Sequence, residues 1–145
     1  MTLAIRSQAD ELMDADDLPV DTYAAVVADL ARVNRVTMAA RPTLAFLDRI
    51  APGDALLRIL DVGFGDGDML RRIAGWAQKR GRAVDLVGVD LNPRSEVAAT
   101  RHTPPALGIR YVTGDYHDLA AEPWDCVISS LVAHHMTRFQ LIDFL

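Results

Sequence analysis

The stretch Ile59–Leu70 reads ILDVGFGDGDML and decides the fold. An apolar, β-rich run ends here with one acid near its end, and a helical pattern begins shortly afterwards. Between the two stand Gly63, Gly65 and Gly67 at two-residue spacing. Glycine permits positive φ and lacks the Cβ that would hold a ligand away, while the first turn of a helix offers unpaired N–H groups. This order predicts a loop whose backbone approaches a ligand, and an ordinary tight turn is the weaker interpretation.

The composition indicates one packed domain. The chain has 145 residues and is 50% hydrophobic, which suits a globular core. Its formal net charge of -5 and its scattered basic residues argue against a nucleic acid partner. No apolar run approaches the roughly 20 residues that span a bilayer, and the N-terminus lacks a secretory signal pattern. We therefore expect a cytoplasmic protein without a membrane partner. Cys126 is the only cysteine, which excludes an internal disulfide.

The N-terminal third of the chain has helical periodicity. Apolar residues at i, i+3 and i+4 spacing predict a helix over about 21–39, with Asp21 or Thr22 as its N-cap. A second helix is predicted from near Pro42 to residue 52. We expect residues 1–54 to form a helical cap over one edge of an α/β domain at 55–145. Asn34, Arg35 and Arg41 lie where such a cap would reach a ligand carboxylate, although a solvated polar face explains each of them singly.

Strands and helices alternate from Leu56 onward. After the first strand, at 56–62, helices are predicted at 68–80, from Asn92-Pro93 to about 102, and from 131 or 132 to 145. Further strands are predicted at 84–90, 109–113 and 124–130. Such alternation predicts a parallel sheet with right-handed crossovers.

Each predicted strand ends in a polar or glycine-bearing signal. These ends are Asp61 with the glycine loop, Asp90, Gly114-Asp115 and Ser129-Ser130. In a doubly wound sheet, ligands bind beyond the carboxyl ends of the strands, where the strand order reverses. The four ends are therefore expected to meet in one crevice.

Four sequence blocks carry a family resemblance. They are DVGFGDG at 61–67, VGVDLNP at 87–93, VTGDYHDL at 112–119 and WDCVISSLVAHHM at 124–136. The glycine spacing differs from the dinucleotide fingerprint G-x-G-x-x-G, whose third glycine would stand at Asp68. Over about residues 55–145 the chain resembles the class I S-adenosylmethionine-dependent methyltransferases, and its last block is similar to their ubiquinone/menaquinone-biosynthesis type. The resemblance implies a Rossmann-like doubly wound parallel sheet, of which the first four strands are present, and S-adenosyl-L-methionine as cofactor.

The resemblance also implies roles for individual residues. Asp61 would hold the ammonium group of the cofactor, and Asp90 would accept both ribose hydroxyls. Asp115 would accept from the adenine amino group, while the Tyr116 N–H would meet a ring nitrogen. The full set of implied cofactor-binding residues is Asp61, Gly63, Phe64, Gly65, Gly67, Asp90, Leu91, Asp115, Tyr116 and Ser130.

The acceptor and the catalytic base are less defined. Residues 129–132 read Ser-Ser-Leu-Val and lack the Asn/Asp-Pro-Pro-Tyr tetrad of amino-group methylases, so a small-molecule oxygen or carbon acceptor is favoured. His134 or His135 would supply a base, since an unperturbed histidine titrates near pH 6.5. Adjacent residues on a helix project about 100° apart, so at most one would face the pocket. A purely structural role for these histidines stays open, and no metal site is predicted.

The family fold has seven strands, and the resemblance covers four of them. The strand at 124–130 would then be an exposed apolar edge, which natural folds cover. We expect either a longer protein whose further C-terminal segment completes the sheet or a partner, such as a second copy, that does so. Two other functions stay open: a NAD-dependent oxidoreductase half-domain, and a non-catalytic nucleotide-binding module.

Overall fold

The computed structural model of the protein describes residues 19–50, 53–130, 132 and 136–144. The strands are β1 (Leu57–Val62), β2 (Val84–Asp90), β3 (Arg110–Thr113) and β4 (Cys126–Ser129). The α-helices are α1 (Val20–Val36), α2 (Arg41–Ile50), α3 (Asp68–Lys79), α4 (Pro93–His102) and α5 (Arg138–Phe144). Two short 3-10 helices are η2 (Pro105–Leu107) and η3 (Tyr116–Leu119).

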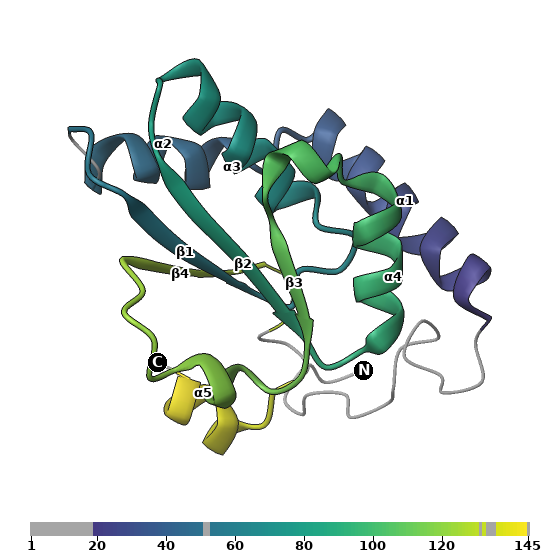
Figure 1. Ribbon diagram of the computed structural model, residues 1–145. Helices are drawn as coiled ribbons and strands as arrows, with labels where there is room; N and C mark the ends of the chain where they lie inside the picture. The colour runs from purple at the N-terminus through teal and green to yellow at the C-terminus, as the bar shows by residue number, and fades with distance from the viewer. Residues whose placement is uncertain (1–18, 51–52, 131, 133–135, 145) are drawn as a thin grey trace, which may run out of the picture.

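The described strands form one parallel sheet in the order β3-β2-β1-β4. The chain moves outward from β1 through β2 to β3 and then returns to the other side of β1, so the strand order reverses between β1 and β4. In the register, Val62 lies opposite both Val89 and Ser129, and Asp90 lies opposite Thr113. The carboxyl ends of the strands therefore lie at one end of the sheet (Figure 1). The predicted Rossmann-like doubly wound fold is confirmed.

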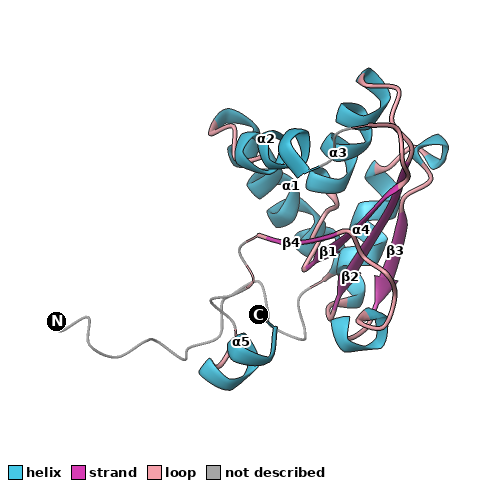
Figure 2. Ribbon diagram, turned by 90° about the vertical axis from the view of Figure 1, so that its left-hand side faces the viewer, coloured by secondary structure: helices cyan, strands magenta, loops and turns pink. Residues whose placement is uncertain are grey.

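Helices α1 to α4 lie on one face of the sheet, and α5 lies beyond the other (Figures 1 and 2). Alternate strand residues supply the two faces, as the pleat of a strand requires. Leu57 and Ile59 pack with α2, α3 and α4, whereas Leu60 and Val62 pack with residues of η3 and α5. The face under α2 to α4 contains the larger cluster of buried side chains.

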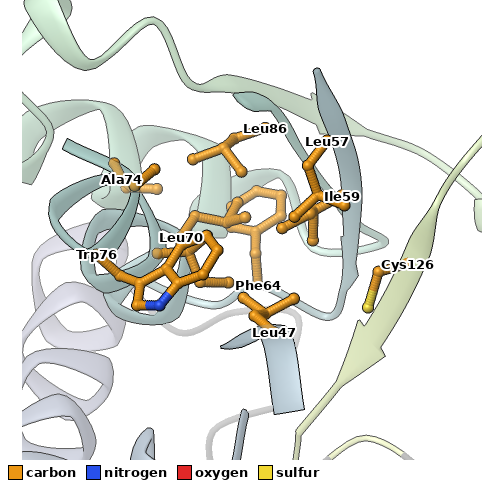
Figure 3. Packing of buried hydrophobic residues seen from close by; sticks show 12 residues of the cluster. Leu47, Leu57, Ile59, Phe64, Leu70, Ala74, Trp76, Leu86 and Cys126 are labelled. Carbon is orange, nitrogen blue, oxygen red and sulfur yellow. The ribbon is translucent and has the colours of Figure 1, made fainter. Parts of the chain in front are cut away.

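Figure 3 shows the side chains of that larger cluster gathered around Phe64. Leu47 of α2 and Leu70 of α3 are fully buried in it, next to Ile59. Replacing such a leucine by alanine typically costs about 2–5 kcal/mol of stability. Cys126 also belongs to this cluster, and burial raises the pKa of its thiol. Because Leu47 shares the core of the sheet, the second N-terminal helix is built into the α/β layer.

Helix α1 lies along α4. The Tyr23 hydroxyl and the Ser95 Oγ are hydrogen-bonded at 2.7 Å although the two residues are 72 positions apart. The Arg101 guanidinium donates to the Asp21 carboxylate at 2.9 Å, and the Arg94 guanidinium lies 5.3 Å from the centre of the Tyr23 ring. These contacts fix α1 to α4, and the helical cap at residues 1–54 stays a prediction.

Several predicted boundaries are confirmed and others are wrong. The second strand has the predicted limits, and Asn92 caps α4 by accepting the Arg94 N–H at 3.0 Å. The predicted N-cap of the first helix is wrong, because α1 begins at Val20 and Asp21 lies in its first turn. Strand β4 begins later than predicted, at Cys126, and the Trp124 indole N–H before it donates to the Leu119 carbonyl at the end of η3.

The last helix also begins later than predicted, at Arg138. Thr137 and Gln140 form a capping box: the Gln140 Oε1 accepts the Thr137 N–H at 2.8 Å, and the Thr137 Oγ1 accepts the Gln140 N–H at 3.3 Å. This reciprocal pair sets the start of α5. Within the described ranges, no helix is both long enough and apolar enough to cross a membrane.

Candidate functional site

A cavity of about 800 Å³ lies at the carboxyl ends of the strands. Nine of the residues that the sequence predicted for the cofactor line it: Asp61, Gly63, Phe64, Gly65, Asp90, Leu91, Asp115, Tyr116 and Ser130. Gly67 is not among the lining residues. His134 and His135 lie outside the described residues. The strand ends that were expected to meet in one crevice therefore do so, at the point where the strand order reverses.

The three glycines of the loop have positive φ, and each is needed for a different reason. A Cβ at Gly63 would overlap Val132, and a Cβ at Gly67 would overlap the Tyr111 hydroxyl. A Cβ at Gly65 would meet no atom within 4 Å, because this residue faces open space at the cavity. Gly67 thus closes the loop against β3 as the N-cap residue of α3, and Gly65 presents bare backbone to the cavity.

Asp90, at the end of β2, holds the glycine loop in place. Its Oδ2 accepts the Gly65 N–H at 3.0 Å, and its Oδ1 accepts the Asn92 N–H at 2.9 Å. One carboxylate therefore joins the loop after β1 to the start of α4 while it also faces the cavity. Leu91 follows it with a side chain that is 76% exposed.

The glycine loop itself carries a carboxylate, that of Asp66, which the sequence analysis did not identify as part of the site. It is 8% exposed, accepts the Asp68 N–H at 3.0 Å and pairs with the Arg71 guanidinium at 2.9 Å. Arg71 also donates to the Asp66 carbonyl. The only signal in the sequence is an acid between two glycines with an arginine one turn into the next helix. This ion pair fixes the loop against α3.

Asp61 is the most deeply buried acid of the site. It is 3% exposed, and among the described residues no donor makes a hydrogen bond to its carboxylate. Burial raises its pKa to about 7, and the negative charge of Asp90 adds to this rise. An unpaired buried carboxylate is costly. Its placement on the cavity wall suits a ligand that brings a positively charged donor.

The strand end after β3 is organised by His117, whose role the sequence did not show. Its Nδ1 lies 2.6 Å from the Asp115 Oδ1, and its Nε2 lies 2.7 Å from the Asp143 Oδ2 on α5. The Asp115 Oδ1 also accepts the His117 backbone N–H, and these bonds lower the pKa of Asp115. The pKa of His117 is raised by Asp143 and then by Asp115. The Tyr116 ring stacks on the His117 ring, with 4.1 Å between the ring centres.

Phe64 reaches the cavity with little of its side chain. Its ring is 5% exposed and packs in the core with Tyr111, at 4.8 Å between ring centres. The Phe64 ring also fills the space that a side chain at residue 88 would need, since a Cβ at Gly88 would lie 2.7 Å from the ring. Phe64 therefore anchors the loop to the core.

Helix α1 forms the remaining wall. Tyr23, Val27, Leu30 and Ala31 line the cavity together with Asn34. The predicted reach of Arg41 is not seen, since Arg41 is exposed and does not line the cavity. The side chain of residue 35 lies outside the described structure. Among the described residues, no lysine or arginine lines the cavity, and no group of three potential ligand side chains is placed to hold a metal ion.

Solved structures with this fold include methyltransferases. Phosphoethanolamine N-methyltransferase 2 from Haemonchus contortus, solved with S-adenosyl-L-methionine, is 26% identical with a TM-score of 0.51, over 68% of this chain and 23% of that one. YjhP from E. coli is 24% identical with a TM-score of 0.50, over 72% of this chain and 42% of that one. A chain from the complex between the Haloferax volcanii Trm112 methyltransferase activator and a methyltransferase is 23% identical with a TM-score of 0.56. The match covers 82% of this chain and 50% of that one.

The last two likenesses show the shared fold alone. The chain spans half or less of the length of each of these three solved proteins. No curated protein matches it. A family model described as a methyltransferase domain matches residues 59–145, which include the glycine loop, all four strand ends and α5. The chain therefore belongs to the methyltransferase domain family.

Proposed function

We propose that this chain binds S-adenosyl-L-methionine in the cavity and is the cofactor-binding part of a methyltransferase. The observation that carries the proposal is the meeting of Asp61, Asp90, Asp115 and the glycine loop around one cavity at the switch point of the sheet. The residues fit the cofactor. A buried carboxylate without a donor suits an ammonium group, and the open backbone at Gly65 lets a ligand approach closely.

The proposed contacts follow the strand ends. Asp61 holds the ammonium group, the backbone of residues 63–65 lies along the methionine portion, and Asp90 accepts from the ribose hydroxyls. Asp115 keeps its Oδ2 for the adenine amino group, because both of its bonds to His117 use Oδ1. Leu91 and Ser130 complete the set. Gly67, which does not line the cavity, acts through the shape of the loop.

The cofactor supplies an electrophilic methyl group, which passes to the acceptor as the sulfonium becomes a neutral thioether and the acceptor gives up a proton. The protein contributes mainly alignment, since well-oriented groups react far faster than free ones. We propose a small-molecule acceptor with an oxygen or carbon nucleophile. His134 or His135 as the base stays a prediction, as do the ubiquinone/menaquinone type and the cytoplasmic location.

We propose a domain boundary at residue 54. Residues 55–145 provide the cofactor contacts, and residues 1–54 provide the α1 wall. A further segment of a longer protein, or a second copy, is proposed to cover the edge of β4.

A dinucleotide is a poorer fit to this site. Its pyrophosphate would approach the N-terminus of α3, where Asp66 and Asp68 line the cavity. Both carboxylates are already paired with Arg71 and Arg72, so these two arginines are not left to pair with a phosphate. The other alternative, a non-catalytic nucleotide-binding module, would bind the same cofactor. It differs from our proposal only in that it would not transfer the methyl group.

Calorimetry with S-adenosylhomocysteine and with NAD tests the proposal. We expect S-adenosylhomocysteine to bind and NAD to bind much more weakly or not at all. The exposed Asp85, on the same strand as Asp90, offers a matched control: Asp85→Asn should keep the affinity that Asp90→Asn loses. Tighter binding of NAD would end the methyltransferase proposal, and binding of the cofactor without methyl transfer by the full-length protein would favour the module.

A further inference from the structure

The two sides of the cavity differ in chemistry. The side formed by the strand ends and the glycine loop carries five aspartates: Asp61, Asp66, Asp68, Asp90 and Asp115. The side formed by α1 and the turn after it is apolar and includes Val27, Leu30, Ala31, Ala39 and Ala40. Because the proposed cofactor contacts all lie on the acidic side, the apolar side is left for a second molecule.

The small side chains on the apolar side make room. Ala31 and Ala40 line the cavity with the smallest side chains on this side, although the protein leaves each only 6% exposed. A cavity of about 800 Å³ is toward the upper end of the roughly 300–1,000 Å³ that ligand pockets occupy. Asn34 is the amide on this wall, and an amide both donates and accepts hydrogen bonds.

The charges around the cavity disfavour an anion. Asp66 and Asp68 are already paired with Arg71 and Arg72, whose guanidinium groups point to these carboxylates. His117, the one basic side chain among the described lining residues, lies between the carboxylates of Asp115 and Asp143. An acceptor with a negative charge would lose its water and find no cation in the described wall to pair with.

We infer that the methyl acceptor is a molecule without negative charge, with an apolar body against Val27, Leu30 and Ala31 and a polar group beside Asn34. This inference rests on the proposed function, because it assigns the α1 wall to the acceptor of the same reaction.

Two probes that share a naphthalene ring and differ in charge test the inference. We would titrate 1-naphthol and 1-naphthoate into the protein saturated with S-adenosylhomocysteine and measure binding by calorimetry. 1-Naphthol should bind at least tenfold more tightly than 1-naphthoate. Equal or tighter binding of the carboxylate would overturn the inference, and so would the absence of measurable 1-naphthol binding. Failure of S-adenosylhomocysteine itself to bind would instead count against the proposed function.

Substitutions on α1 locate the subsite. Ala31→Leu places a larger side chain in the cavity and should weaken 1-naphthol binding at least tenfold while S-adenosylhomocysteine affinity stays within about twofold. Ala25→Leu makes the same change on the exposed face of α1 and should alter neither affinity. Leu30 is 39% exposed, so Leu30→Ala removes apolar surface from the cavity wall with little effect on the core. This variant should also weaken 1-naphthol binding. Unchanged 1-naphthol binding in both Ala31→Leu and Leu30→Ala would refute the α1 subsite.

Discussion

Asp61 links stability to pH in a way that can be measured. Its carboxyl is 3% exposed, and burial together with Asp90 raises its pKa from 3.8 to about 7. Between pH 3.8 and about 7, the folded state therefore keeps a proton on Asp61 that the unfolded state has released. The stability that comes from this proton is fully present below pH 3.8 and is lost as pH rises through about 7. At 1.36 kcal/mol per pKa unit, the rise corresponds to about 4 kcal/mol against the ionised form.

Asp61→Asn removes this titration and keeps the shape of the side chain. Water that enters the cavity will solvate part of the charge, so we expect the variant to be about 2–4 kcal/mol more stable than the wild type above about pH 8. Below about pH 4, where the wild-type carboxyl is protonated in both the folded and the unfolded state, the two proteins should be equally stable. The same substitution should weaken S-adenosylhomocysteine binding at least tenfold, since the proposed partner of the ammonium group is lost.

Urea unfolding of the ligand-free protein, repeated at several pH values, measures the difference. Asp85→Asn removes an exposed acid from β2 and should leave the pH profile unchanged. Parallel profiles for the wild type and Asp61→Asn would refute the reasoning, because they would show that Asp61 titrates normally. A more stable variant with undiminished affinity would keep the burial argument and remove the ammonium contact.

Three further predictions concern the rest of the site. Asp90→Asn should weaken S-adenosylhomocysteine binding by about 1–3 kcal/mol, because polar partners are left unsatisfied, and an unchanged calorimetric affinity would contradict the ribose contact. Gly67→Ala should lower stability in urea by about 1–3 kcal/mol or more, because φ is +76° and the new Cβ would overlap the Tyr111 hydroxyl, whereas Gly75→Ala in open space on α3 should be neutral or stabilising. Only protonated His117 donates to both of its carboxylate partners, and its pKa is raised. Hydrogen exchange of α5, corrected for intrinsic rates, should therefore speed up as pH rises through that pKa, and His117→Gln should remove this dependence.

Local patterns predicted much of the fold. Val84–Asp90 and the Asn92-Pro93 helix start are confirmed, because an apolar run and an N-cap are properties of neighbouring residues. The first helix was given a wrong cap, and the last helix was started too early. In the second case the capping box of Thr137 and Gln140 competes with a longer apolar pattern, and it sets the boundary at Arg138.

The sequence by itself determined the order of strands and helices, the glycine loop and the polar strand ends, because these depend on spacing along the chain. The missing third glycine also counted against a dinucleotide, while the sulfonium cofactor followed from the family resemblance. The tertiary structure alone decided the raised pKa of Asp61, the hydrogen bond between Tyr23 and Ser95 and the α1 wall of the cavity. The reason is physical: burial, charge proximity and cavity shape arise between residues that are far apart in the chain, and no local pattern records them.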